Sequence, residues 1–342
     1  MAEVSMIGID LSKRSFQLHG MCADGSVGFR RTLSRGALLD FLARQPGCVV
    51  AMEACGGAHH WGREILKLGH EVRLVPPVYV KPFVKRQKND AADAQAICEA
   101  ASRPTMRFVA VKGKAQQGRG MLFRVRDLLV RQRTQAINAL RGHLAEFGVV
   151  APQGPAHVAK LARALEDADA DLPELVREFG GVLLDQIAGL DAKIAALDRE
   201  LAAQARQDSD ARRLMTIPGV GPVTAMAIQA FAPPLDGFRH GRDFSAWLGL
   251  VPRQHTTAGK PRLGKISKMG QRDLRRLLVC GAMSVIQNAV RRGGTVRDPW
   301  LADMLARKPR KLVAVALANR MARIAWAVTT RQESYRASAP AA

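Results

Sequence analysis

The sequence predicts a mixed α/β domain followed by a mainly helical region. In the first hundred residues, short β-rich apolar runs alternate with segments of helical periodicity. From about residue 116 to residue 206, the apolar residues keep a helical spacing. The chain has 342 residues, a length that favours more than one domain.

Three β-rich runs come before the first helix, and further runs follow it. Ala23-Asp24-Gly25 marks a turn between the second and third runs, so we expect a meander. The later runs alternate with helices, which predicts a mixed sheet. The predicted strands are residues 4–10, 15–22, 27–33, 48–54, 71–75 and 108–111.

Helices are expected between the later strands. Ser34 is expected to cap a helix that ends near Arg44, and residues 59–68 form the next helix. Pro76-Pro77 breaks the chain, after which residues 78–101 are expected to be helical with an interruption at 85–89. Acidic residues at strand ends and on this late helix would then converge, as in the ribonuclease-H-like layout.

The helical region carries a heptad seam, in which apolar residues alternate spacings of four and three. The seam predicts a coiled coil or a helical hairpin, with Pro152-Gln153-Gly154-Pro155 as the break after an earlier amphipathic helix at 119–147. Self-association through these helices is also expected. The seam residues are Leu183, Ile187, Leu190, Ile194, Leu197 and Leu201.

These features divide the chain into four parts. Residues 1–114 form the α/β domain, 115–207 the helical or coiled-coil region, 208–336 a mainly helical C-terminal domain, and 337–342 a disordered tail. The C-terminal domain opens with Ile217-Pro218-Gly219-Val220-Gly221 between helical segments, which resembles the hairpin of helix-hairpin-helix modules. We expect Gly219 and Gly221 to present backbone N–H groups to a nucleic-acid phosphate, although a plain turn would look similar.

The charge indicates a polyanionic partner. The chain has 52 Lys and Arg against 30 Asp and Glu, a formal net charge of +22. No stretch of about eighteen apolar residues lacks a charge, which disfavours a membrane. The N-terminus has no secretory signal and the five cysteines form no C-x-x-C pair, so we expect free thiols in a reducing cytoplasm.

Basic residues are densest between residues 252 and 276, which we interpret as a mobile loop followed by a helix. Their density predicts contacts to several phosphates, with an ordinary solvated surface as the alternative. The residues expected to bind nucleic acid there are Arg253, Lys260, Arg262, Lys265, Lys268 and Arg272.

Four carboxylates are candidates for chemistry. Asp10 and Glu53 end two apolar strands, and Asp90 and Asp93 lie three residues apart on a predicted helix, where they share one face. Caps and helix-dipole contacts explain such residues singly. Together they predict a site for Mg²⁺ or Mn²⁺, because hard cations prefer oxygen ligands and two such ions can orient an in-line displacement at phosphorus.

Seven short motifs follow one another along nearly the whole chain: Gly8-Ile9-Asp10-Leu11-Ser12-Lys13, Met52-Glu53-Ala54-Cys55-Gly56-Gly57, Val75-Pro76-Pro77, Lys88-Asn89-Asp90-Ala91-Ala92-Asp93-Ala94, Ile217-Pro218-Gly219-Val220-Gly221, Gly249-Leu250-Val251-Pro252-Arg253-Gln254-His255 and Gly264-Lys265-Ile266-Ser267-Lys268-Met269-Gly270. In this order they resemble the DEDD transposases of bacterial insertion sequences, the one-ten and eleven-eleven group. The resemblance implies a RuvC-like domain whose acidic set maps onto Asp10, Glu53, Asp90 and Asp93.

The resemblance also implies a nucleophilic serine in the C-terminal domain, which forms a covalent link to DNA in a site completed by a partner subunit. This chain has threonines there: Thr257 aligns best with the serine, and Thr256 is the alternative. Threonine keeps a hydroxyl that can attack phosphorus, but its methyl group crowds the attack. A working threonine nucleophile is our preferred interpretation over an inactive enzyme or an engineered change.

The leading hypothesis is therefore a DNA transposase or recombinase that cuts and rejoins strands. By resemblance, its partners are DNA (element ends and target), an element-encoded guide RNA and further copies of itself, as a dimer or tetramer. The alternatives are a metal-dependent, structure-specific nuclease such as a RuvC-like resolvase, and an inactive nucleic-acid-binding relative.

Overall fold

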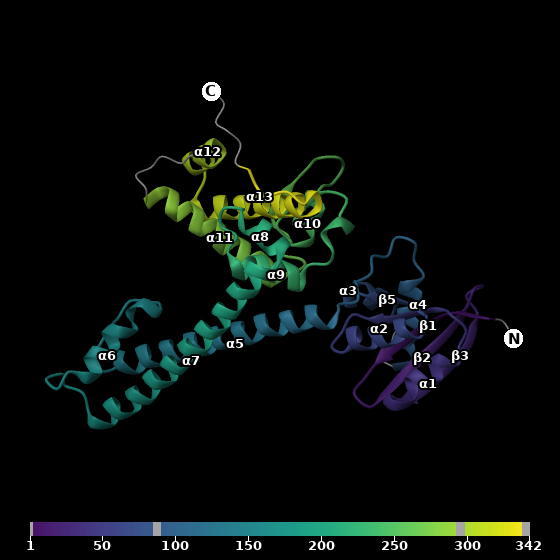
Figure 1. Cartoon of the computed structure of the whole chain (residues 1–342), viewed down its shortest axis with the longest axis horizontal. Helices are drawn as coiled ribbons and strands as arrows, with labels where there is room; N and C mark the ends of the chain where they lie inside the picture. The colour runs from purple at the N-terminus through teal and green to yellow at the C-terminus, as the bar shows by residue number, and fades with distance from the viewer. Residues whose placement is uncertain (1–2, 85–89, 292–297, 337–342) are drawn as a thin grey trace. The chain divides into compact units, whose positions relative to one another are not determined.

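The computed structural model describes residues 3–84, 90–291 and 298–336, with the backbone but not the side chain of Asp90. The chain forms two compact units, Met1–Gln117 and Gly118–Ala342, and the boundary falls within one long helix (Figure 1). The first unit contains a five-stranded sheet, and the second is mainly helical. The predicted tail at 337–342 lies outside the described residues.

The sheet of the first unit has the strand order β3-β2-β1-β4-β5. Strands β1 (Val4–Leu11), β2 (Ser15–Cys22) and β3 (Val27–Ser34) form the predicted antiparallel meander, and β4 (Val49–Glu53) and β5 (Glu71–Val75) run parallel to β1. The expected mixed sheet is confirmed. The last predicted strand, 108–111, is wrong: only Val109 pairs, in an isolated bridge to Leu74.

Alternation along the strands separates two apolar layers. Ile7 and Ile9 of β1 point to the face covered by α1 (Leu38–Ala43) and α2 (Ala58–Lys67), where they form one buried cluster with side chains of both helices. Met6 and Ala51 belong to the opposite face, which is covered by α4 (Asp90–Ala101). Both faces are therefore covered at β1 and β4, as expected for parallel strands with crossover connections, whereas the edge strand β3 is largely exposed.

Two helix predictions in this unit need correction. Ser34 makes no side-chain cap, and the first turn is a 3₁₀ helix, η1 (Arg35–Ala37), whose Arg35 N–H donates to the Arg14 carbonyl at 3.1 Å. The long helix expected at 78–101 is divided into α3 (Pro77–Val80), η2 (Lys81–Phe83) and α4. The polar stretch 85–89 lies outside the described residues.

The heptad seam forms a helical hairpin within the chain. Helix α5 (Lys114–Ala145) is followed by η3 (Pro155–His157), α6 (Val158–Glu166) and α7 (Glu174–Gln207). The seam residue Ile187 packs in one buried cluster with Ile137, Leu140 and Leu144 of α5. Ion pairs reinforce the same contact: Arg126 donates to Asp198 at 2.5 Å and Arg133 to Asp191 at 2.5 Å.

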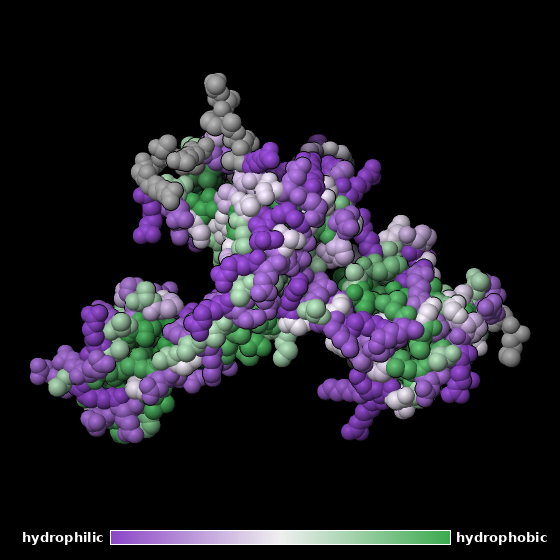
Figure 2. All heavy atoms as spheres, in the orientation of Figure 1, coloured by the Kyte–Doolittle hydropathy of each residue, from purple (hydrophilic) through white to green (hydrophobic). Residues whose placement is uncertain are grey.

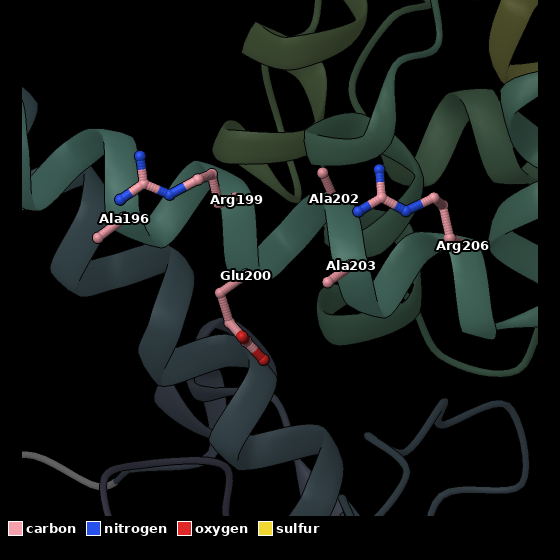
Figure 3. Close-up of a pocket in the computed structure, with 6 residues that line it drawn as sticks. All are labelled: Ala196, Arg199, Glu200, Ala202, Ala203 and Arg206. Carbon is pink, nitrogen blue, oxygen red and sulfur yellow. The ribbon is translucent and has the colours of Figure 1, made fainter.

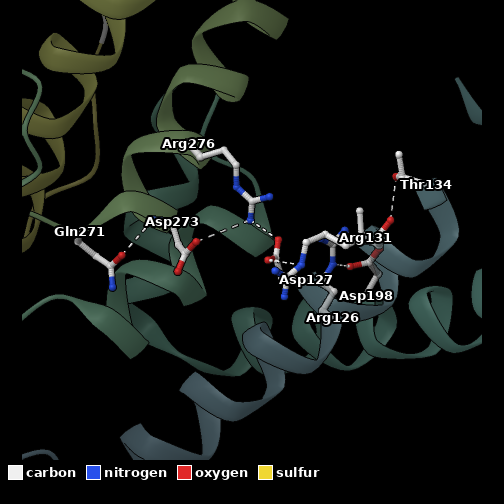
Figure 4. A network of polar contacts seen from close by, with 9 residues as sticks. Arg126, Asp127, Arg131, Thr134, Asp198, Gln271, Asp273 and Arg276 are labelled. Carbon is white, nitrogen blue, oxygen red and sulfur yellow. Dashed lines mark hydrogen bonds and ion pairs between the residues drawn. The ribbon is translucent and has the colours of Figure 1, made fainter. Parts of the chain in front are cut away.

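The ion pairs of the hairpin continue into the C-terminal core (Figure 4). Asp127 of α5 accepts from Arg276 of α11 (Arg272–Arg291) at 2.5 Å, and Arg131 lies 3.5 Å from the same carboxylate. Exposed pairs of this kind contribute about 0–1 kcal/mol each, so the network defines geometry more than stability.

The C-terminal core is a cluster of helices around α13 (Arg310–Arg331). This helix is long and apolar enough to span a membrane, but Val313, Leu317 and Met321 on it are buried in the core, so it is a core helix. Around it pack α8 (Ser209–Met215), α9 (Pro222–Phe231), η4 (Leu235–Gly237), α10 (Gly241–Trp247), α11 and α12 (Pro299–Arg307).

Apolar side chains are exposed near the turn of the helical hairpin. Phe147 and Val150 follow α5, and Leu175, Phe179 and Val182 lie four and three residues apart on α7. Figure 2 shows hydrophobic residues on the visible face at this end, where α6 packs on the hairpin. Large apolar side chains are thus left exposed to solvent at this end of the helical hairpin.

Candidate active site

Asp10 and Glu53 lie at the same level of adjacent parallel strands. The β1–β4 register pairs Ile9 with Met52, so the next residues along both strands are Asp10 and Glu53. Ile9 and Met52 face the α1–α2 layer, and alternation therefore directs both carboxylates to the α4 face. Both side chains are partly buried.

Helix α4 brings Asp93 over this position. Its neighbour Ala94 has a carbonyl oxygen so close to Gly8 of β1 that a Cβ on Gly8 would overlap it, and Cys98 Sγ would lie 2.7 Å from that Cβ. The absence of a side chain at Gly8 thus permits the close approach of helix and strand. Asp90 begins the same helix, and its side chain is not described.

The charges of these carboxylates act on neighbouring groups, in agreement with the strand register. Burial raises the pKa of Glu53, and the negative charge of Asp93 raises it further. Burial also raises the pKa of the Cys55 thiol, with added effects of the charges on Glu53 and Asp10. Asp10, Glu53 and Asp93 therefore share one region of negative potential.

The donor set of this region suits a hard cation. It consists of carboxylate oxygens, the ligands preferred by Mg²⁺ and Mn²⁺, and like charges held together are stabilised by a cation. Among the described side chains, no three of the His, Cys, Asp or Glu type come close enough to hold one ion. The side chain of Asp90, the fourth candidate, stands outside that comparison.

The segment predicted as a mobile basic loop forms a β-hairpin, and the helix expected after it is α11. Strand β6 (Pro252–Gln254) pairs with β7 (Leu263–Ile266), and the His255 N–H donates to the Arg262 carbonyl at 2.8 Å. At the tip, Lys260 N–H donates to the Thr257 carbonyl at 3.1 Å, and Ala258 and Gly259 have φ of 48° and 75°. Two successive positive φ values are typical of a type I′ turn, which suits the twist of paired strands.

Both candidate nucleophiles lie at this tip. Thr256 and Thr257 are exposed, and Thr257 is the first residue of the turn. Two serines nearby in the sequence, Ser245 and Ser267, are less accessible: Ser267 is partly buried, and Ser245 is buried with its hydroxyl donating to the Arg242 carbonyl at 2.9 Å. The tip therefore presents threonine hydroxyls to solvent.

The hairpin is held to the core by a tight neck. Gly249 and Gly270 both have positive φ, and a Cβ on either would overlap a backbone oxygen, of Met269 and Trp247 respectively. Arg275 ties the same two segments together by donating to the Leu248 carbonyl at 2.8 Å and the Met269 carbonyl at 3.3 Å. Burial lowers the pKa of Arg275, and the nearby positive charge of Arg272 lowers it further.

The basic residues divide into paired and unpaired groups. Arg253 donates to the Ser267 carbonyl at 3.1 Å, which closes the base of the hairpin. The other five make no ion pair within the described part of the chain, and all are exposed: Lys260, Arg262, Lys265, Lys268 and Arg272. Exposed and unpaired cations of this kind are available to phosphates.

Two further cations, which the sequence analysis did not single out, lie on α7. Arg199 and Arg206 are seven residues apart and extend from the same side of the helix (Figure 3). They lie beside a shallow open hollow that is also lined by Ala196, Glu200, Ala202 and Ala203. The spacing of seven was a usable signal, but the heptad seam on the same helix concealed it.

The glycines of the predicted phosphate-binding turn differ from each other. Gly219 has a φ of 84° and packs against Gly281 of α11, where a Cβ would meet the Gly281 carbonyl at 2.7 Å. Gly221 is exposed and precedes α9 directly as its N-cap. Packing therefore accounts for Gly219, whereas Gly221 lies at a free helix start that suits an anion.

Comparisons with known proteins identify the family. A family model described as "Transposase IS116/IS110/IS902 family" matches residues 211–295, and a second, the transposase model DEDD_Tnp_IS110, matches residues 7–148. A "Probable family 20 transposase" of Pseudomonas aeruginosa is 48% identical over 335 residues, covering 97% of this chain and 99% of the relative.

The chain belongs to the IS116/IS110/IS902 family of transposases. Two further relatives are named for their elements. The "Transposase for insertion sequence element IS1328" of Yersinia enterocolitica is 45% identical over 97% of this chain and 98% of its own length. The "Transposase for insertion sequence element IS1111A" of Coxiella burnetii is 39% identical over 99% of this chain and 93% of its own.

The family assignment makes this chain a DNA-acting enzyme of an insertion sequence. The predicted resemblance and enzyme class are thereby confirmed. In this transposase, Asp10 and Glu53 lie on adjacent strands of the first unit with Asp93 on the helix that covers them, and Thr256 and Thr257 lie at a hairpin tip in the second.

Proposed function

We propose that the transposase cuts and rejoins DNA with Asp10, Glu53, Asp90 and Asp93 as ligands of Mg²⁺ or Mn²⁺ and Thr257 as the attacking hydroxyl. The observation that carries this proposal is the common level of Asp10 and Glu53 on adjacent parallel strands, with Asp93 on the helix above. This is the position at which a ribonuclease-H-like domain of the RuvC type is expected to hold its acidic set.

The carboxylates fix the position of the reacting phosphate in this proposal. A bound divalent cation supplies stabilisation of the negative charge that develops on the phosphoryl oxygens. Asp10 and Glu53 are fixed by the backbone of two buried strands, and Asp93 by a helix packed on the same face. Rigid supports of this kind keep ligands in the productive geometry.

Strand cutting proceeds by attack of the Thr257 hydroxyl on phosphorus. A bond forms between Thr257 Oγ1 and phosphorus, the bond from phosphorus to the leaving sugar oxygen breaks, the hydroxyl proton passes to water, and the sugar oxygen takes up a proton. The accessible tip and the rigid neck support this role. Rejoining is the reverse step with a different sugar hydroxyl.

The remaining partners follow from charge and exposed apolar surface. The unpaired cations of the β6–β7 hairpin and the free N-terminus of α9 at Gly221 suit DNA and an element-encoded guide RNA. The apolar patch of Leu175, Phe179 and Val182 suits a second copy of the chain in a dimer or tetramer. We place the reaction in the bacterial cytoplasm.

Substitution of one carboxylate tests the proposal. Asp10→Ala should abolish recombination between element-end and target DNA and leave nucleic-acid binding within about twofold, because binding is carried mainly by phosphate contacts of cations. Asp40→Ala is the matched control, since Asp40 is exposed on α1. Normal recombination by Asp10→Ala would contradict the carboxylate role.

A further inference from the structure

Three polar side chains on neighbouring strands form a row across the sheet, and the first of them is the Asp10 carboxylate. Strand pairing places Asp10 of β1 opposite Gln17 of β2, and Gln17 opposite Thr32 of β3. Their strand neighbours, Phe16 and Leu18 among them, belong to the α1–α2 layer, so the row lies on the α4 face with Asp10. Directly opposed residues on one face have Cβ atoms about 4.5–5.5 Å apart, within reach of a side-chain hydrogen bond.

The outer half of this row is joined by a hydrogen bond. Thr32 Oγ1 donates to Gln17 Oε1 at 2.9 Å. The oxygen and nitrogen of a carboxamide lie on opposite sides of its carbon, so an oxygen held towards β3 directs the NH₂ group towards β1. The residue opposite on β1 is Asp10, whose carboxylate only accepts hydrogen bonds when ionised.

We propose that Gln17 is a positioning residue for Asp10. With the cation bound, its carboxamide donates an N–H to the Asp10 carboxylate, and Thr32 holds the carboxamide in the orientation that makes this possible. The inference rests on the proposed function, in which Asp10 binds the divalent cation. Gln17 then restricts the rotamers of Asp10 and leaves the other lone pairs of its carboxylate for the cation.

The surroundings of Gln17 favour this role over a packing role. Phe16 and Leu18, the neighbours of Gln17 on β2, belong to the apolar core of the α1–α2 layer. Gln17 points to the other face and is not part of this core. Gln17 is partly buried, and its partner Thr32 is exposed. An exposed neutral hydrogen bond contributes only about 0.5–1.5 kcal/mol to stability. Loss of this bond should therefore leave the fold intact and affect the ligand that it orients.

Binding of Mn²⁺ to the full-length protein tests the proposal without any reaction. We would titrate wild type, Gln17→Leu, Thr32→Val and the double variant with Mn²⁺ alone, followed by the electron paramagnetic resonance signal of the free ion. Ser34→Ala is the control, because Ser34 lies two residues from Thr32 on β3 and makes no cap hydrogen bond. Thermal unfolding of each variant checks that the fold is kept.

The expected pattern of Mn²⁺ affinities is specific to a relay, in which Thr32 orients Gln17 and Gln17 orients Asp10. Gln17→Leu should weaken Mn²⁺ binding about 10- to 100-fold, the range for residues that orient a metal ligand, and Thr32→Val should weaken it less. Adding Thr32→Val to Gln17→Leu should cause no further loss, because Thr32 acts through Gln17. Ser34→Ala should bind like wild type.

Two results would overturn the relay, and Asp10→Ala distinguishes their meaning. If Asp10→Ala loses Mn²⁺ while Gln17→Leu binds like wild type, the role of Gln17 is wrong and the proposed function stands. Additive effects of Thr32→Val and Gln17→Leu would likewise contradict the relay. If Asp10→Ala binds like wild type, the proposed metal site itself is wrong.

Discussion

Gly8→Ala is expected to separate the helix α4 from the strand that carries Asp10. The new Cβ would overlap the Ala94 carbonyl oxygen and lie 2.7 Å from Cys98 Sγ, so the helix or the strand has to move. The carbonyl belongs to the helix backbone and cannot rotate away, which makes the cost that of a core with one methyl group too many, about 1–3 kcal/mol. At roughly 4 °C per kcal/mol for a domain slightly over 100 residues, Tm should fall by roughly 4–12 °C.

The same displacement should affect catalysis more than stability. Asp93 is next to Ala94 on α4, so a movement of about 1 Å changes its distance to Asp10 and Glu53, and misplacement on this scale can reduce rates about 10²-fold. The assay is single-turnover cleavage of element-end DNA well below Tm, with circular dichroism as the check of folding. Gly36→Ala is the control, since a Cβ there meets no atom within 4 Å.

A second substitution refines this prediction. Cys98→Ala removes the sulfur but not the Ala94 carbonyl, so it should restore only part of the stability lost in Gly8→Ala. If Gly8→Ala has the Tm and the cleavage rate of wild type, the close packing of α4 on β1 does not set the geometry of the carboxylates.

Three further predictions concern the second unit. Lys265→Ala should weaken DNA binding for all sequences and reduce the slope of log K against log[salt] by about 1, whereas Arg133→Ala, whose charge is already paired, should leave the slope unchanged; equal slopes in both variants would contradict phosphate binding by the hairpin. Thr257→Ser should form the covalent DNA adduct at least as fast as wild type, because serine lacks the crowding methyl group; loss of the adduct on a denaturing gel would count against Thr257. Arg275→Met should keep overall helicity but increase hydrogen exchange at the neck of the hairpin, since two carbonyl contacts are lost; unchanged exchange would show that the glycine packing alone holds it.

The sequence was sufficient for most of the elements of the sheet. The strands at 15–22 and 71–75 end at the predicted residues, because alternation and turn signals are local properties of the chain. The start of α1 could not be predicted in the same way. The helix is preceded by a 3₁₀ turn, the Arg35 N–H donates to the Arg14 carbonyl of the β1–β2 connection, and the Ser34 side chain makes no capping hydrogen bond.

The basic hairpin was missed for a different physical reason. Its turn needs Ala258 at a φ of 48°, a conformation that residues other than glycine and asparagine rarely adopt, so no sequence signal marked it. Its strands are short and exposed, with charged residues at positions that would otherwise show apolar alternation. The density of Arg and Lys thus indicated the chemistry of this segment but not its structure.

In the candidate site, too, the sequence indicates which residues carry the chemistry but not how they are arranged. The motifs identify Asp10, Glu53 and Asp93 individually, and the parallel register with the close approach at Gly8 brings them together. Gln17 belongs to no motif, and only the pairing of β2 with β1 and β3 places it beside Asp10. Residues that act through a neighbour in the next strand are therefore hidden until the register is known.

The most direct test of the account is a search for a covalent intermediate. Wild type and Thr257→Ala would be incubated with element-end DNA, RNA from the same element and Mg²⁺, then separated on a denaturing gel. The account predicts a Mg²⁺-dependent protein–DNA band for wild type and neither band nor strand cleavage for Thr257→Ala. Cleavage of DNA by both proteins with no covalent band would contradict it and indicate a hydrolytic nuclease.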